Sequence, residues 1–516
     1  MDITEWYMVA LAGILAFSIV ASRLIRLART IRKYFLNHVF YPYIHRYLRG
    51  SKHITRFNAI LIVVFWVGNI LCSTIGVKDV LELARRSALL STINLIPVLL
   101  GAHMNIIVSY YGIRLPTYTR IHACIGIVAV IEGLVHTVAI SSLQKPNLKI
   151  QSDAAGLTAA ITTAIILLSS VASIRRYIYE AFSKLHLILA AIAVGSIYIH
   201  CPSKQLWAPP VVYLFTAVCL HILISLVRFF YILYRNIKHK RPLNRATMRT
   251  LTYKRLHARE IQVSDAIHVH VRLSRPWRPR AGQYIYLCIP GVNYTSFMQL
   301  HPFYVSWWYY DADGNHFLVL LVQKRRGFTK DLFSYTSDSL SHEDGRRALI
   351  EGPYGKELDL GSYDTVILFA TGIGIAAQLP YVRRLLERYR TFEVETQRIA
   401  LFWEIESELH VAWVADMMDE LLEKDTDKIL DIQLFVLGKY ISIETRPGDI
   451  VRIGKRIDVN YRPMDPESLI RKQTESRKGR IVVSLCTNNE TNDKIREIVR
   501  RIRDKSIDFK ELEFRP

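Results

Sequence analysis

Two apolar stretches of equal length decide how this chain folds: residues 122–136 read HACIGIVAVIEGLVH and residues 186–200 read HLILAAIAVGSIYIH. Each stretch begins and ends with a histidine, and each is apolar enough to form most of a membrane span. In an α-helix, fourteen residues advance the chain by about 21 Å and return to within about 40° of the starting direction. Each helix is therefore predicted to carry two imidazoles on one face, one towards each side of the membrane.

The four histidines are predicted to act as two facing pairs. Both helices are expected to cross the membrane in the same direction, so His122 should face His186 and His136 should face His200. Facing imidazoles can fill both axial positions of a b-type haem, and we therefore predict two haems with these histidines as the metal ligands. The alternative is that the histidines only hydrogen-bond to neighbouring helices. The repeated interval and the cost of polar groups in lipid favour the haems.

One carboxylate lies in the same face of the first of these helices. Glu132 comes one turn before His136. Its carboxylate could orient the free ring N–H of that histidine, as acceptors do for many metal-bound imidazoles. The alternatives, a hydroxyl partner on another helix or a protonated carboxyl, have equal support from the sequence.

The composition is that of a protein that lies partly in a membrane. Of the 516 residues, 51% are hydrophobic, and the mean hydropathy is +0.16. We therefore predict an integral, multi-pass α-helical membrane domain of about seven helices, surrounded by lipid. The expected spans are residues 6–25, 57–77, 87–113, 120–143, 154–174, 182–202 and 206–230.

Charge predicts the orientation of these spans. Residues 1–240 contain 24 Lys and Arg but 7 Asp and Glu, and many of the basic residues lie between spans one and two. The positive-inside rule places that loop in the cytosol, and seven crossings then place the C-terminal half there too. Basic residues between apolar stretches do not indicate nucleic-acid binding. The first span is expected to remain as an anchor, in the plasma membrane or the endoplasmic reticulum. The six cysteines show no CxxC spacing and suggest neither a disulfide framework nor a zinc site.

The C-terminal half is predicted to contain two lobes. Residues 245–357 alternate with period two, as in Ile267, Val269, Val271 and Leu273, and indicate an antiparallel β-barrel. Residues 364–516 alternate between buried strands and helices, which is typical of a doubly wound α/β fold. Residues 439–479, rich in charge, are expected to be an insertion or a mobile loop. The predicted domains are 1–56 (first helix and basic loop), 57–240 (haem-binding membrane domain), 245–357 and 364–516.

A glycine turn follows the first strand of the second lobe. Gly372 and Gly374 lie in Thr371-Gly-Ile-Gly-Ile-Ala376, where a strand is expected to end and a helix to begin. Backbone N–H groups at such a turn suit a pyrophosphate. The alternative is that the turn only joins a strand to a helix.

Several short motifs follow one another along the chain: the two histidine pairs, Gly282-Gln-Tyr284, His301-Pro-Phe303, Gly327-Phe-Thr329, Gly352-Pro-Tyr-Gly355 and the Gly372/Gly374 turn. Their order resembles the ferric reductase and NADPH oxidase transmembrane superfamily, and most resembles fungal ferric-chelate reductases. The resemblance implies a ferredoxin reductase-like half in which His301, Pro302, Phe303 and Tyr304 hold FAD. It also implies that Gly327 and Thr329 clasp the flavin pyrophosphate.

The chain departs from this family near the expected nicotinamide site. Cys486 is followed by Thr and Asn where the family has Gly and Pro, and Tyr304 replaces a Thr or Ser beside the flavin. Glu406 stands where an Arg often binds a 2′-phosphate, which favours NADH. Arg462, followed by Pro463, resembles the family's Gly-Arg-Pro and could serve NADPH. The resemblance therefore implies NADPH as donor, with NADH as the alternative.

These parts predict a transmembrane oxidoreductase. A nicotinamide delivers two electrons and a haem accepts one, so a flavin must stand between them. No side chain is expected to be a catalytic acid, base or nucleophile, because the chemistry belongs to the cofactors. We expect ferric or cupric complexes as the acceptor, with oxygen and superoxide production as the alternative. A redox-sensing channel or receptor is a third hypothesis, and the sequence leaves an oligomer open.

Overall fold

The computed structural model describes residues 55–516, apart from short gaps, and a few single positions before residue 55. The first predicted span, residues 6–25, lies outside the described residues. The structure divides into two compact units: one contains residues 1–102 and 119–222, and the other contains residues 103–118 and 223–516. The gaps are 112–114, 172–173, 176–178, 239–242, 255–260, 295, 339–344, 439–445, 454–455, 476–478, 503–506 and 513–516.

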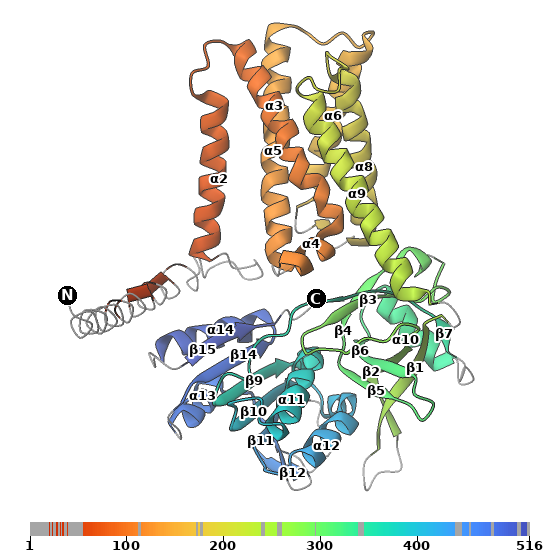
Figure 1. Ribbon diagram of the computed structural model, residues 1–516, viewed down its shortest axis with the longest axis vertical. Coiled ribbons are helices and arrows are strands. Elements are labelled where there is room, and N and C mark those ends of the chain that lie inside the picture. The colour runs from red at the N-terminus through yellow and green to blue at the C-terminus, as the bar shows by residue number, and fades with distance from the viewer. Residues whose placement is uncertain are drawn as a thin grey trace, which may run out of the picture. The chain divides into compact units, whose positions relative to one another are not determined.

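The first unit is helical (Figure 1). Within the described residues, five helices are long and apolar enough to cross a membrane, rather than the seven predicted. They are α2 (Arg56–Thr74), α5 (Leu115–Leu143), α6 (Gln151–Ser169), α8 (Tyr179–His200) and α9 (Val211–Asn236). The multi-pass helical class is confirmed at this coarser level.

The third predicted span, residues 87–113, is not one helix. The chain forms α3 (Val80–Leu99), a 3-10 turn η2 (Leu100–His103) and the short helix α4 (Met104–Tyr111). Pro97 lies inside α3 and lacks the N–H of a regular helical turn, and the 3-10 turn follows within one turn. Apolar composition continues across this interruption, which explains why the prediction of one span was wrong.

The first lobe of the second unit is antiparallel but consists of two separate sheets. The larger has the order β5-β6-β2-β1-β7 and the smaller the order β4-β3-β8, so the described strands do not form the predicted closed barrel. The period-two prediction is confirmed, because Ile267, Val269 and Val271 of β2 are fully buried. The strands are β1 (Arg245–Lys254), β2 (Ile261–Arg272), β3 (Tyr284–Cys288), β4 (His301–Tyr304), β5 (Trp307–Tyr310), β6 (His316–Gln323), β7 (Arg346–Arg347) and β8 (Leu349–Tyr354).

The second lobe is the predicted doubly wound α/β fold. Its sheet has the order β12-β13-β11-β10-β9-β14-β15, and all neighbours are parallel except β12 and β13. One core contains residues of α11 (Ile375–Arg390) and α12 (Ala415–Lys424), and a second contains residues of α13 (Pro466–Glu475) and α14 (Asn489–Arg501) (Figure 1). The strands are β9 (Thr365–Thr371), β10 (Arg398–Ile405), β11 (Leu430–Val436), β12 (Ile450–Ile453), β13 (Ile457–Asn460), β14 (Ile481–Cys486) and β15 (Ile507–Glu511).

The charge-rich segment 439–479 is in part a regular portion of this lobe. It contributes β12 and β13 to the sheet edge and α13 to one face. Arg452 of β12 and Asp458 of β13 form an ion pair at 2.8 Å, so charge on these strands faces solvent while Val459 is buried. The expectation of a mobile loop is therefore wrong for these described residues, and that of an insertion stays a prediction.

Candidate functional site

Two histidine pairs face each other between α5 and α8. The ring centroids of His122 and His186 lie 6.3 Å apart, and those of His136 and His200 lie 5.9 Å apart. The planes of the rings are inclined by 61° and 67°. The structure thus brings the four histidines together in the pairing that the fourteen-residue spacing predicted.

Backbone carbonyls orient two of these rings. Nδ1 of His136 lies 2.9 Å from the Ala84 carbonyl oxygen, and Nδ1 of His200 lies 2.8 Å from that of Ser152. A carbonyl only accepts a hydrogen bond, so Nδ1 carries the proton in both rings. Nε2 is then the nitrogen with a free lone pair in each ring, which is the state a metal ligand needs.

Glu132 does not orient His136. Its Oε2 accepts a hydrogen bond of 2.9 Å from the Asn94 side chain on α3, and Asn94 also donates to Asn69 on α2 at 2.9 Å. The residue is 6% exposed. The Ala84 carbonyl of α3, rather than Glu132, therefore orients the His136 ring. The Glu132 carboxylate instead belongs to a hydrogen-bonded chain with Asn94 and Asn69 that links α5, α3 and α2.

The residues predicted to hold the flavin form β4 and the start of α10 (Phe328–Asp338). His301 stacks on Phe328, with ring centroids 4.3 Å apart and planes inclined by 10°. The following residues, Pro302 and Phe303, pair with β3, and Tyr304 lies opposite Tyr284. Burial lowers the pKa of His301. His301 to Tyr304 and the Gly327-Phe-Thr329 motif are thus neighbours in the fold.

A tight turn precedes α10. Gly327 has a φ of +68°, a conformation that glycine adopts without strain. The Thr329 hydroxyl accepts a hydrogen bond of 3.0 Å from the backbone N–H of Arg325. The turn therefore exposes the N-terminus of an eleven-residue helix, where backbone N–H groups suit an anion.

The glycine turn after β9 lies against the end of β14. A Cβ on Gly374 would come within 3.3 Å of the Cys486 sulfur and closer still to its backbone. The backbone N–H of Asn488 donates to the Thr371 hydroxyl at 2.7 Å, which ties the same two strand ends together. Gly372, with a φ of +47°, would place a Cβ in open space. Both glycines therefore follow the carboxyl end of β9, beside the carboxyl end of the adjacent parallel strand β14, and such ends form the usual nucleotide-binding edge of these sheets.

Glu406 and Arg462 follow strands of the same sheet, and both are exposed. The sequence did not predict a contact close to both in the chain: Glu404 Oε2 accepts a hydrogen bond of 2.9 Å from the Met464 backbone N–H. Burial raises the pKa of Glu404. This bond joins the end of β10 to the segment that carries Arg462. No sequence signal identifies this bond, because its two residues are sixty positions apart.

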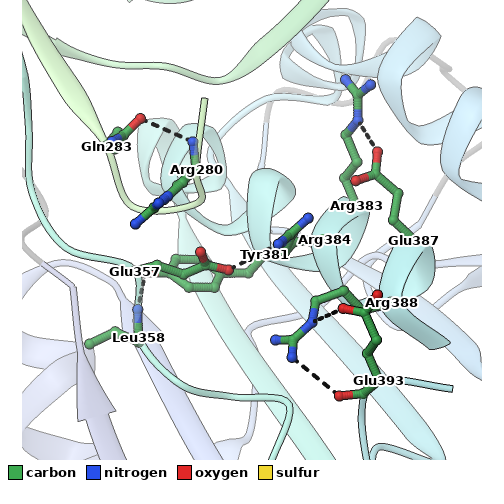
Figure 2. Close-up of polar contacts among 10 residues, drawn as sticks. All are labelled: Arg280, Gln283, Glu357, Leu358, Tyr381, Arg383, Arg384, Glu387, Arg388 and Glu393. Carbon is green, nitrogen blue, oxygen red and sulfur yellow. Dashed lines mark hydrogen bonds and ion pairs between the residues drawn. The ribbon is translucent and has the colours of Figure 1, made fainter. Parts of the chain in front are cut away.

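The contact between the two lobes was also missed. Tyr381 of α11 reaches Gly282, where a Cβ would lie 3.3 Å from its Cζ atom, and its hydroxyl accepts from the Leu358 N–H at 3.1 Å (Figure 2). Arg383 packs on the Trp307 and Trp308 rings and donates to the Trp308 carbonyl at 2.8 Å. Gly282 therefore has a packing reason in this fold.

Three family models match successive parts of the chain. Residues 87–197 match the ferric reductase like transmembrane component, residues 251–358 an FAD-binding domain, and residues 363–478 the ferric reductase NAD binding domain. The matched models are thus a transmembrane component, an FAD-binding domain and an NAD-binding domain, in this order along the chain.

The chain is also similar to curated fungal proteins. It is 29% identical over 265 residues to the probable cell surface ferric reductase kap2 of Aspergillus oryzae, covering 50% of this chain and 33% of that protein. It is 24% identical over 457 residues to ferric/cupric reductase transmembrane component 1 of Candida albicans, covering 80% and 55%. The chain is thus similar to fungal ferric reductases, and it spans between a third and about half of these relatives' length.

Among solved structures, the ferredoxin reductase of carbazole 1,9a-dioxygenase resembles the chain with 12% identity and a TM-score of 0.34. That likeness covers 52% of this chain and 69% of that one.

Proposed function

We propose that the protein moves electrons from cytosolic NAD(P)H through FAD and two b-type haems to an acceptor across the membrane. The single observation that carries this proposal is the pair of facing histidine pairs on α5 and α8, in a chain that also matches FAD-binding and NAD-binding domains. A flavin between donor and haems is required because hydride carries two electrons and haem iron accepts one. His122, His136, His186 and His200 are the proposed axial ligands.

The spacing of the rings supports two-sided coordination. An imidazole nitrogen binds a metal at about 2.0 Å, and the ring centre lies about 1.2 Å beyond it, so two rings on opposite sides of one metal have centres about 6.4 Å apart. The observed separations of 6.3 and 5.9 Å fit this value. An ordinary edge-on ring contact can have the same separation, as between His268 and His270 at 5.9 Å, so the assignment rests on the repeated fourteen-residue interval and on the orientation of the rings. The protonated Nδ1 of His136 and of His200 supports the same assignment.

We propose that β4 and the start of α10 hold FAD. Tyr304, His301 and the Gly327-to-Thr329 turn lie together, so that side chains can contact the flavin while the helix N-terminus binds its pyrophosphate. The nicotinamide nucleotide is proposed to bind across Gly372, Gly374 and Cys486. Glu406 and Arg462 then lie at the ribose end and set the choice between NADPH and NADH, with NADPH the proposed donor.

We propose ferric or cupric complexes as the acceptor. This choice of acceptor is supported by the similarity to proteins that are named as ferric and ferric/cupric reductases. Oxygen, reduced to superoxide, is the second candidate, because a haem near a membrane surface can also pass one electron to oxygen. The plasma membrane or the endoplasmic reticulum is the proposed location, with the C-terminal half in the cytosol.

The test uses the purified full chain in detergent. Wild type is expected to hold FAD and two haems with both axial positions filled, and to reduce a ferric chelate when given NADPH or NADH. Superoxide is measured in parallel, and superoxide without ferric reduction would select the second candidate. His122→Ala with His186→Ala should lose one haem, whereas His221→Ala, which changes a histidine bonded to the Leu99 carbonyl, should keep both. Full haem content in the double variant, or a chain without haem, would refute the proposal.

A further inference from the structure

Two glycines lie directly against haem-ligand candidates, one in each histidine pair. A Cβ on Gly101, in η2, would lie 3.1 Å from Cγ of His122 and closer still to Nδ1 and Cε1. A Cβ on Gly156, in α6, would lie 2.6 Å from Nδ1 of His200 and 2.8 Å from Cε1. In both cases the collision is with the imidazole itself. Each ring therefore occupies the space that any other residue would fill with its side chain.

The contacts around each ring fix where it lies. Nδ1 of His200 bonds to the Ser152 carbonyl at 2.8 Å, one helical turn before Gly156, so the ring lies against that turn of α6. Gly101 is buried and belongs to the 3-10 interruption that follows Pro97. The two glycines contact histidines on different helices, since His122 is on α5 and His200 is on α8.

We propose that Gly101 and Gly156 are positioning residues, each of which sets the place of one imidazole and, through it, one haem. This inference rests on the proposed function. Moving the His200 ring from a Cβ distance of 2.6 Å to an ordinary contact of 3.4 Å requires a displacement of about 0.8 Å. Metal–ligand distances vary by only about 0.2 Å around their usual values. The added methyl group must therefore displace the ring, the helix or the haem.

Helix packing alone does not account for these two glycines. Alanine is the better helix former, so helix propensity does not explain a glycine at either position. Gly195 of α8 and Gly68 of α2 have no atom within 4 Å of a built Cβ, and Gly126 of α5 meets only Val98 at 4.0 Å. The collisions with imidazoles are thus specific to Gly101 and Gly156. Gly195, five residues from His200 on the same helix, provides a matched control.

The experiment compares Gly101→Ala, Gly156→Ala and Gly195→Ala in the purified full chain. Haem per protein and the low-temperature reduced spectrum are measured before any turnover, with His122→Ala and His200→Ala as references for the two haem signals. We expect Gly101→Ala to lose or shift only the signal missing in His122→Ala. Gly156→Ala should affect only the signal missing in His200→Ala, and Gly195→Ala should match wild type.

The remaining outcomes each count against the proposal. Both alanine variants with wild-type haem content and spectra would show that the rings do not depend on these glycines. Loss of both signals in either variant, with Gly195→Ala intact, would show a role in helix assembly instead. If wild type itself carries no haem, the proposed function fails first, and this inference fails with it. Bound flavin, measured in every sample, reports on folding of the C-terminal half.

Discussion

The last membrane helix is tied to the flavin lobe by an ion pair whose loss should measurably destabilise the protein. Arg228 of α9 makes two bonds to Glu351 of β8, from Nε at 2.9 Å and from Nη2 at 2.7 Å. Glu351 is fully buried and also accepts from the Tyr354 hydroxyl at 2.8 Å. Tyr231, one turn later on α9, donates to the Gly352 carbonyl at 2.7 Å. An ion pair and a hydrogen bond therefore join the end of α9 to β8.

Arg228→Met should lower the free energy of unfolding more than an ordinary surface substitution does. It leaves the Glu351 carboxylate buried without its counter-charge, and breaking such a pair costs about 3–5 kcal/mol. Because the Arg228 side chain is 28% exposed, water can reach part of the vacated site, and we expect the lower end, about 3 kcal/mol. Arg228→Met with Glu351→Leu should recover part of this loss, because no unpaired charge then remains.

The assay is thermal unfolding of the purified protein in detergent, monitored by tryptophan fluorescence. Arg471→Met is the control: it breaks the helical pair with Glu467, in which Arg471 is 57% exposed, and such pairs contribute less than about 1 kcal/mol. The expected order of stability is wild type and Arg471→Met, then the double variant, then Arg228→Met. Equal midpoints for Arg228→Met and Arg471→Met would refute the reasoning.

Three further changes test other parts of the molecule. Glu406→Arg should raise the ratio of kcat/KM for NADPH over NADH, and an unchanged ratio would mean that this side chain does not face the ribose. Gly282→Ala should destabilise the protein more than Gly291→Ala does in thermal unfolding: both have positive φ, but only Gly282 meets other residues, among them Tyr381. Burial lowers the pKa of His270 to about 4. This pKa is below the value of about 6.5 in the unfolded chain. The contribution of His270 to the free energy of unfolding is therefore fully present above pH 6.5, and it falls by about 3 kcal/mol as the pH drops to 4. Unfolding at pH 7 and pH 4.5 should show a smaller loss in His270→Gln, and an equal loss would contradict the assignment.

The sequence predicted best where one simple period dominates. The fourteen-residue interval placed His122 opposite His186 because two straight helices running in one direction leave a single pairing. The runs of apolar residues at 365–370 and 481–486 predicted central parallel strands, and both are buried in the sheet. Periodicity is informative in these places because burial is complete on one face or on both.

Prediction failed where a local exception competes with composition. Proline and glycine are both tolerated in membrane helices, so neither Pro97 nor Gly101 predicted that residues 87–113 would form two helices joined by a 3-10 turn. The edge strand β12 and its neighbour β13 are only four residues long, and each carries one charged residue, Arg452 and Asp458, within a charge-rich segment. Such short strands look like a loop in sequence. Glu132 was ambiguous for another reason, since its partner Asn94 lies 38 positions away on another helix. Such contacts depend on how helices pack.

Motif glycines show how one sequence signal can have two physical origins. Gly282 and Gly374 both belong to motifs associated with bound nucleotides, yet a side chain at either position would collide with protein atoms, from Tyr381 in one case and from Cys486 in the other. Packing within the protein is therefore a sufficient reason for these two glycines. Gly372 differs, because its φ of +47° needs glycine while the space beside it is open. Of the three, Gly372 is the position at which a ligand, rather than the protein, can occupy the space that a side chain would take.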